Sequence, residues 1–254
     1  MDRAIILATL NLHAVLPRLE DLIRLDEEAK AIASGMNLSV RFRVAGGPSR
    51  VVEIRKGRVS SSGDPNRPAE LGLLFTSCDQ LNNMFMDKPA VPIPYKRLDK
   101  LIQMKKFTRL TEIMTRYLRP SDESLKDPAF KRKFVDMTLQ TALAGTAQVA
   151  KHDPKMHQVV GHLPHGTIQL SVLPDGPFAW VRVDTDKNIE GGTGTIKNPS
   201  ANLNINGLDV AVDMLADRLD QFAALGTGDL EATGLLPLID EFGALLDRVG
   251  KFLA

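Results

Sequence analysis

Four of the five histidines lie in one short segment, which makes them the first candidates for metal or acid–base chemistry. They are His152, His157, His162 and His165. A zinc site needs three or four ligands, each oriented by hydrogen bonds of its own. No cysteine or obvious acidic partner completes such a set locally. The sequence therefore predicts histidines of loops and of the surface, and no metal site.

Two stretches imitate ligand-binding loops without their full spacing. Residues 184–188 begin like a calcium loop, but its sixth and twelfth positions, which require Gly and Glu, hold Ile189 and Thr195. Residues 191–194 are rich in glycine, yet a phosphate loop needs a helix directly behind it. The residues that follow are typical of a strand end or a turn, so we expect a polar connection and a glycine-rich hairpin.

Cys78 directly follows Ser77, which is the predicted cap of a helix. A helix N-terminus lowers the pKa of a thiol, but no histidine base lies nearby to support a nucleophile. The chain also lacks a nucleophile-elbow motif and a metalloprotease helix motif. We therefore expect a structural thiol, no enzymatic activity and no cofactor. A single cysteine excludes an intrachain disulfide and favours a cytoplasmic protein.

The composition is that of an ordinary globular protein. Of 254 residues, 43% are hydrophobic and 25% are charged, and the formal net charge is +1. This excludes collagen-like, disordered and disulfide-framework classes. No run of about 18 apolar residues predicts a membrane span. Because only 5% of residues are aromatic, stacking platforms for nucleic acid are not expected.

The order of predicted elements repeats along the chain. Each half begins with a helical stretch, continues with strands of alternating polarity, and ends with two helices separated by a loop. In the first half the clearest segments are the helical residues 4–32, the strands 38–44, 51–55 and 71–75, and the helix 77–88. In the second half they are the helix 129–151, the strands 168–172, 178–183 and 201–205, and the helix 206–218.

The two copies also align residue by residue. Residues 84–88 correspond to 214–218, an offset of 130, and residues 107–118 correspond to 242–253, an offset of 135. Five residues are therefore missing from the first copy, and we place the gap in the loop at residues 89–94. The predicted domains are residues 1–118 and 128–254, joined by a linker at 119–127.

The second copy carries a recognisable end pattern. Residues 201–205 alternate, Asn206 and Asp209 cap a helix, and Gly228 and Gly234 flank a short strand before an amphipathic last helix. In this pattern each half resembles a sterol carrier protein type 2 domain. The first copy departs from it, because residues 92–95 contain two prolines and no glycine pair, so its short strand is left open.

The resemblance implies two similar α+β domains. Each would have a roughly five-stranded mixed sheet that helices cover on one face, with an apolar tunnel between sheet and helices. The residues agree independently, because strands with one apolar face must be covered and amphipathic helices are available. The resemblance further implies non-covalent binding and carriage of a fatty acyl chain, an acyl-CoA or a sterol-like molecule. The alternative is a protein-interaction or accessory scaffold with filled cavities, for example in lipid or quinone biosynthesis.

The predicted lipid-binding residues lie on the apolar faces of one strand and of the closing helices in each copy. They are Phe75, Met84, Phe85, Leu101 and Phe107 in the first copy, and Ile205, Met214, Leu215, Leu236 and Phe242 in the second.

Charge is unevenly divided between the copies. Residues 1–118 hold 19 Lys+Arg and 13 Asp+Glu, a net of +6, whereas residues 119–254 hold 13 and 18, a net of −5. A basic amphipathic stretch in the first copy is typical of a surface that meets anionic lipid, although a merely solvated basic face is the alternative. Oligomeric state stays open. The cations expected at a membrane are Lys96, Arg97, Lys100, Lys105 and Lys106.

Overall fold

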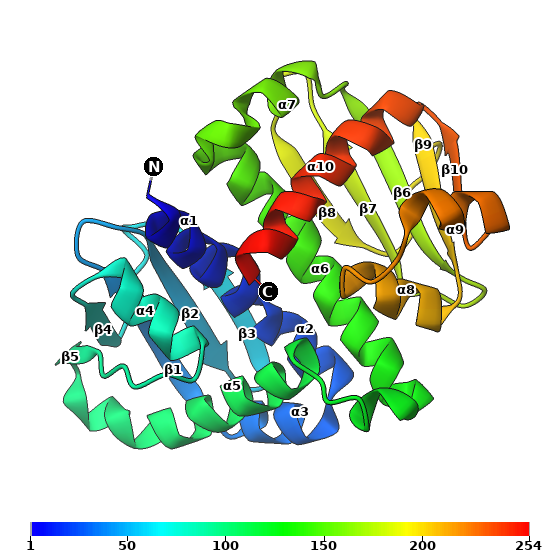
Figure 1. Cartoon of the computed structure of the whole chain (residues 1–254). Coiled ribbons are helices and arrows are strands. Elements are labelled where there is room, and N and C mark those ends of the chain that lie inside the picture. Colours follow the sequence, from blue (N-terminus) through cyan, green and yellow to red (C-terminus); the bar gives the residue numbers. More distant parts are fainter. Residues whose placement is uncertain (1, 254) are drawn as a thin grey trace. The chain divides into compact units, whose positions relative to one another are not determined.

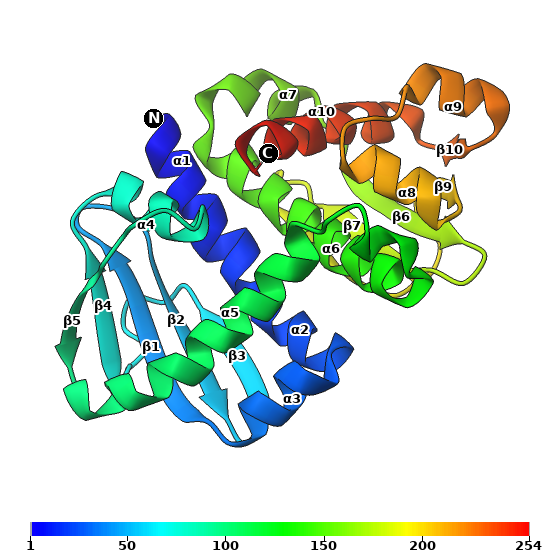
Figure 2. The same ribbon diagram turned by 60° about the horizontal axis from the view of Figure 1, so that its bottom comes forward.

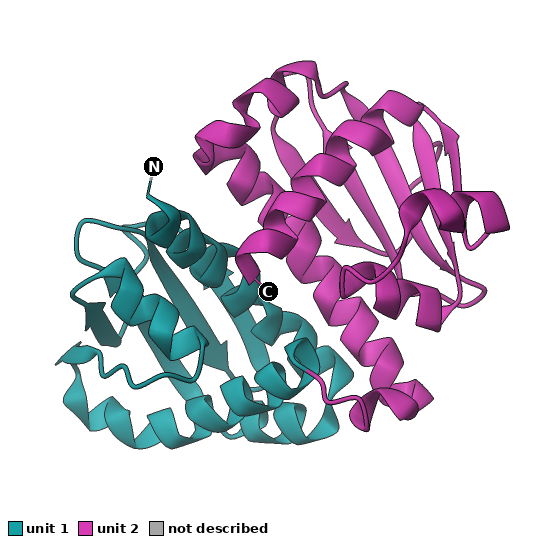
Figure 3. Cartoon of the chain, in the orientation of Figure 1, with its two compact units in different colours: residues 1–119 teal, residues 120–254 magenta. Residues whose placement is uncertain are grey.

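The computed structural model describes residues 2–253. The protein divides into two compact units, residues 1–119 and residues 120–254 (Figure 3). The boundary follows the predicted end of the first domain by one residue. Residues 120–127, expected within a linker, belong to the second unit and contain the short helix η4 (Ser124–Lys126).

The first unit is built around one mixed sheet. Its elements are α1 (Arg3–Leu10), η1 (Asn11–Val15), η2 (Leu16–Arg18), α2 (Leu19–Leu25), α3 (Glu27–Ser34), β1 (Asn37–Val44), β2 (Ser49–Arg55), β3 (Arg58–Ser62), β4 (Leu71–Phe75), α4 (Cys78–Phe85), β5 (Ile93–Lys96), η3 (Leu98–Gln103) and α5 (Met104–Leu118). The strand order is β3-β2-β1-β4-β5. β1 is parallel to β4, and the other neighbours are antiparallel.

The second unit has the same plan. After η4 come α6 (Pro128–His152), η5 (Pro154–Met156), α7 (His157–His162), β6 (Gly166–Leu173), β7 (Phe178–Val183), β8 (Ile189–Thr193), β9 (Ala201–Asn206), α8 (Leu208–Leu215), α9 (Gln221–Thr227), β10 (Leu230–Gly234) and α10 (Leu236–Leu253). The strand order is β10-β9-β6-β7-β8, with β6 parallel to β9. Read from the opposite edge, this is the order of the first sheet, and the α+β class with five-stranded mixed sheets is confirmed.

The helices of each unit cover one face of its sheet (Figures 1 and 2). The central strand β1 supplies an apolar row to that face, and α5 supplies its own buried stripe at helical spacing. Burial of these two surfaces against each other stabilises the first unit. The buried residues are Leu38, Val40, Phe42 and Val44 of β1, and Phe107, Leu110, Ile113, Met114 and Tyr117 of α5.

On the opposite face of each central strand, a polar side chain forms hydrogen bonds with the backbone of the segment that leads to the next parallel strand. In the first unit the Arg41 guanidinium donates a hydrogen bond to the carbonyl of Arg67. In the second unit the Gln169 amide donates to the Gly194 carbonyl at 3.3 Å and accepts from the Ile196 N–H at 2.9 Å. These bonds satisfy backbone groups of a crossover that has no ladder of its own.

The units differ in length at one edge. Leu71 pairs with Lys96, and Ala201 pairs with Gly234, so the offset of 130 on the inner strand becomes 138 on the edge strand. The buried stripes of α5 and α10 return to 135. The predicted five-residue gap was therefore wrong in detail. The loop before β5 is eight residues shorter than its counterpart, and three residues are added between β5 and α5.

The strand left open in the first copy is present as β5. Lys96 adopts a φ of 67° where its counterpart Gly234 has 86°, so a lysine takes the left-handed position that glycine occupies in the second unit. The predicted cap of α8 was wrong. Gly207, with a φ of 113°, precedes the helix, and the Asn206 side chain instead donates to the carbonyl of Gly228.

Candidate functional site

Three phenylalanines form the buried floor of the helix-covered face in the first unit. The Phe42 ring lies 6.5 Å from the Phe75 ring and 5.6 Å from the Phe107 ring, measured between centroids. All three side chains are at most 4% exposed. Sequence analysis named Phe75 and Phe107 but missed Phe42, whose alternation in β1 was the available signal. Aromatic rings at these separations attract each other beyond their burial, so the floor is a fixed element.

The remaining predicted residues of the first unit lie progressively nearer to solvent. Met84 and Phe85, in the last turn of α4, are half-buried. Leu101, in η3, is 37% exposed. The five predicted residues thus run from a closed aromatic floor to an exposed rim beside the edge strand β5.

The second unit repeats this gradient with different residues. Ile205 of β9 and Phe242 of α10 are buried, and Met214 and Leu215 of α8 are half-buried. Leu236 is 52% exposed at the start of α10. Each of the five positions falls in the same burial class as its predicted counterpart in the first unit.

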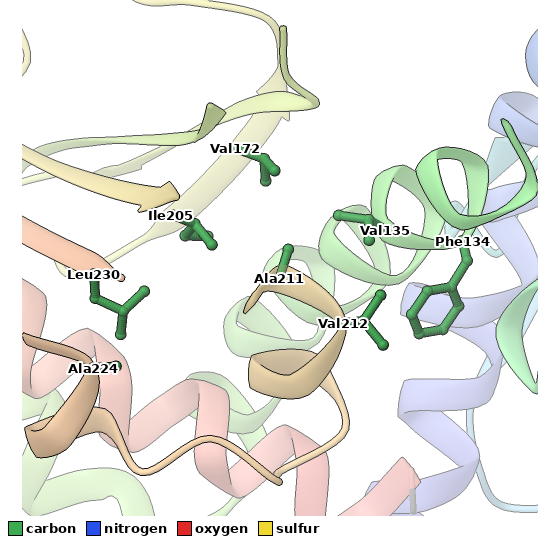
Figure 4. Packing of buried hydrophobic residues seen from close by; sticks show 8 residues of the cluster. All are labelled: Phe134, Val135, Val172, Ile205, Ala211, Val212, Ala224 and Leu230. Carbon is green, nitrogen blue, oxygen red and sulfur yellow. The ribbon is translucent and has the colours of Figure 1, made fainter. Parts of the chain in front are cut away.

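Side chains from three helices meet three strands in the second unit (Figure 4). The buried members are Phe134 and Val135 of α6, Val172 of β6, Ile205 of β9, Ala211 and Val212 of α8, Ala224 of α9 and Leu230 of β10. Met214 and Leu215 pack against this cluster as partly buried neighbours. The helix α9 has no counterpart in the first unit, so only the second unit adds Ala224 to its apolar layer.

The ends of α4 and α8 place the half-buried pairs in the same way. The residue after each cap, Asp87 or Asp217, is left-handed, with φ of 53° and 55°. The next N–H groups, of Lys88 and Arg218, donate to carbonyls of Asn83 and Asp213 at 2.9 Å. This is a Schellman ending, which stops a helix at a defined residue. It fixes the last turn of each helix, which carries Met84 in α4 and Met214 in α8.

In each unit a buried carboxylate at a helix end contacts a side chain of the last helix. In the first unit the Tyr117 hydroxyl donates to Asp26 at 2.7 Å. In the second unit the Arg248 guanidinium donates to Asp153 at 2.6 Å. Burial alone would raise the pKa of the Asp153 carboxyl. The hydrogen bonds from Arg248 and from the Lys155 N–H outweigh burial and hold that pKa below its usual value.

The other residues that were candidates for chemistry have structural roles in this fold. Burial raises the pKa of the Cys78 thiol, and the charges of Asp79 and Asp2 raise it further, so helix-terminus activation does not prevail. The Asp184 carboxylate accepts the N–H groups of Asp186 and Asn188 at 2.8 Å, as in a turn. Among residues 2–253 no group of three His, Cys, Asp or Glu side chains is arranged to hold a metal ion.

Within the same described part of the chain, no helix combines the length and apolarity needed to cross a bilayer.

Comparison with known proteins gives likenesses to sterol carrier domains. No model of a protein family and no curated protein matches the chain. Among solved structures, sterol carrier protein domain 2 of Helicoverpa armigera is similar at 14% identity and a TM-score of 0.35, covering 45% of this chain and 89% of that one. A protein described as UbiJ-SCP2, a ubiquinone synthesis protein, is similar at 15% identity and a TM-score of 0.35, over 45% and 90%. Palmitated SCP2L2 of Aedes aegypti is similar at 18% identity and a TM-score of 0.32, over 44% and 90%.

Proposed function

We propose that each unit binds the hydrocarbon part of a lipid between its sheet and its last two helical segments, and carries it without covalent chemistry. The ligand would be a fatty acyl chain, an acyl-CoA or a sterol-like molecule. The driving force is removal of hydrocarbon from water, about 0.8 kcal/mol for each CH₂ group. The chain's residues supply the surface, and no cofactor is required for this process.

The observation that carries the proposal is the matched burial gradient in the two units. Residues of unlike size, such as Phe75 and Ile205, occupy the same buried place, while Leu101 and Leu236 are exposed at the rim. Stability alone requires a buried apolar core. It does not require an exposed apolar side chain at the corresponding edge of that core in both units. Exposed apolar surface beside a buried apolar layer is typical of a ligand-binding site.

The half-buried methionines provide the sharpest test. Met84→Glu and Met214→Glu each place a carboxylate within one proposed site, and a flexible thioether is the side chain that adapts best to an irregular ligand. We expect each variant to lose uptake of a fluorescent fatty acid in its own unit, so that the stoichiometry falls while the other site stays filled. Native mass spectrometry, with extraction of co-purifying lipid, reads that stoichiometry directly.

Matched controls place the same carboxylate at exposed positions. The controls are Thr108→Glu, at an exposed position of α5 next to Phe107 in the sequence, and Ala216→Glu, at the exposed position directly after α8. Both should bind probe as the wild type does, and circular dichroism checks the fold of all four variants, since a buried charge can unfold a domain. Unchanged uptake in folded Met84→Glu and Met214→Glu would overturn the proposal.

A second function has one observation in its favour. In the second unit α9 adds Ala224 to the cluster of Figure 4, so side chains of the protein itself occupy more of the apolar layer there. A filled layer suits a protein-interaction or accessory scaffold. Wild-type protein that takes up no acyl or sterol probe and releases no lipid on extraction would favour that function for both units.

A further inference from the structure

Five large aliphatic side chains are exposed in the first unit between the end of α4 and the start of α5. Val91 is 82% exposed and Ile102 is 79% exposed, and the others are Leu98 at 53%, Ile93 at 52% and Leu101 at 37%. The loop that carries Val91 is attached to α4, because the Gln80 side chain donates to the Val91 carbonyl at 2.8 Å. These side chains are therefore presented along the β5 edge by ordered backbone, and such exposure of aliphatic groups marks an interaction surface.

Cations alternate with these side chains. Residues 86–106, which we call the basic edge, contain six Lys and Arg against two Asp, a net of +4. Two of the cations are already paired, Arg97 with Asp99 at 2.8 Å and Lys100 with Glu70 at 3.3 Å. Lys96 and Lys105 are exposed and have no carboxylate within ion-pair distance among the described residues. The edge thus keeps positive charge beside its aliphatic side chains.

The corresponding segment of the second unit has the opposite charge. Residues 216–241, which we call the acidic edge, contain one Arg against six Asp and Glu, a net of −5. Exposed apolar side chains are present there as well, with Phe222 at 90% and Leu236 at 52%. Both edges therefore expose apolar side chains, but their charges are opposite. Comparing them separates the contribution of charge to binding from the contribution of hydrophobicity.

We propose that the basic edge docks the first unit onto an anionic lipid bilayer. Val91 and Ile102 would enter the boundary between headgroups and acyl chains, and Lys96 and Lys105 would lie at the level of the lipid phosphates. A bilayer is the occupant chosen by this surface because it offers both an apolar layer and a sheet of negative charge above it. The acidic edge is repelled by the same surface. Docking requires no lipid inside either unit, so it is independent of the proposed carriage.

Cosedimentation with phosphatidylcholine vesicles, with and without phosphatidylglycerol, tests the proposal on the full chain. We expect binding only to the anionic vesicles, and weaker binding when ionic strength rises, because salt screens exposed charges. Replacing the aliphatic side chains in Val91→Ser/Ile102→Ser, or the cations in Lys96→Asn/Lys105→Asn, should weaken binding by about tenfold or more. Asparagine is chosen at position 96 because it tolerates the left-handed backbone there.

The second unit supplies the matched control. Phe222→Ser removes the most exposed apolar side chain of the acidic edge and should leave vesicle binding unchanged. Equal binding to neutral and anionic vesicles, no binding to either, or an equal loss in Phe222→Ser would each overturn the proposal. The Met84→Glu variant, designed to block uptake, should still bind anionic vesicles, so that failure of docking and failure of carriage are read separately.

Discussion

The two units have the same strand order and the same gradient of burial, yet they treat the edge beside their last strand differently. The first connects α4 to β5 by a short loop with Pro89 and Pro92, and the second connects α8 to β10 through the additional helix α9. The sheet tolerates this difference because the change lies in a surface connection. What the insertion changes is how much of the apolar layer the protein covers with its own side chains.

The units also differ in what joins the short helix to the first helix. In the first unit the Asn11 side-chain amide donates to the side-chain oxygen Oδ1 of Asn82 at 3.0 Å, and the Asn82 side-chain amide donates to the backbone carbonyl of Ala4 at 3.0 Å. In the second unit the position of Asn82 is taken by Val212, which packs in the apolar cluster with Val135. One fold therefore accepts either a satisfied polar pair or an apolar contact at this place, provided that no amide is left unpaired.

The largest expected effect tests whether the buried phenylalanine of the last helix has the same structural role in both units. Phe107→Ala and Phe242→Ala each remove a buried ring and leave a cavity, which costs about 3–5 kcal/mol of unfolding free energy. Hydrogen exchange followed by mass spectrometry measures each unit separately, with amides of β1 and β6 as reporters. Each substitution should lower protection in its own unit by a similar amount. A cost in one unit alone would show that the two phenylalanines do not have the same structural role.

The second prediction concerns the polar pair. Asn82→Val leaves the buried Asn11 amide without its acceptor, and Val212→Asn buries an amide in the apolar cluster, so each should cost about 1–3 kcal/mol. In the first unit, the double change Asn11→Leu/Asn82→Leu should recover part of that loss, because no polar group remains to be satisfied. Urea denaturation measures all three. A double variant as unstable as Asn82→Val would show that packing, rather than the unpaired amide, determines the cost.

The third prediction is a dependence of stability on pH in the second unit. The pKa of Asp153 is lowered in the folded state, so between its folded and unfolded pKa values the unfolded chain binds more protons, and stability rises with pH there. The contribution is complete above the unfolded pKa and is lost as pH falls through the folded pKa. Asp153→Asn should lower stability at neutral pH and flatten this acid limb, measured by denaturation from neutral to acidic pH. An unchanged limb would mean that other carboxylates produce it.

Alternation and helical spacing were enough to predict the types of most elements and two of the three floor phenylalanines, Phe75 and Phe107. The rows at Leu71, Leu73 and Phe75 and in α5 face the core as expected, since burial imposes those periods. The edge was harder. Pro94 in β5 argued against a strand, but proline is tolerated at an edge, where no neighbour needs its missing N–H. Lys96 concealed the left-handed turn because the glycine that signals it elsewhere is absent.

Two further features depend on partners that are distant in sequence. Gln169 contacts residues 25 to 27 positions away, and Asn11 contacts Asn82 across 71 positions, so neither pairing follows from local pattern. The carboxylates Asp26 and Asp153 are similar cases, because a helix cap is visible in sequence whereas its second partner on the last helix is not. That the ten named residues contact a ligand stays a prediction, which the uptake experiment decides.

The smallest expected effect tests whether the Schellman ends of α4 and α8 limit stability equally. An L-residue in the left-handed region costs about 1–2 kcal/mol, and Asp, whose short side chain bonds locally, lies at the low end of that cost. Glycine removes this penalty. It also makes the unfolded chain more flexible, so that folding loses more conformational entropy, which costs about 0.5–1 kcal/mol. Asp87→Gly and Asp217→Gly should therefore each stabilise their own unit slightly, by at most about 0.5 kcal/mol. Asp87→Ala and Asp217→Ala, which keep the penalty, should not stabilise either. Unit-resolved hydrogen exchange measures the differences. A gain at Asp217 without one at Asp87 would mean that the short loop after α4 strains the end of that helix. The eight-residue difference in loop length would then affect the stability of the helix end as well as the loop itself.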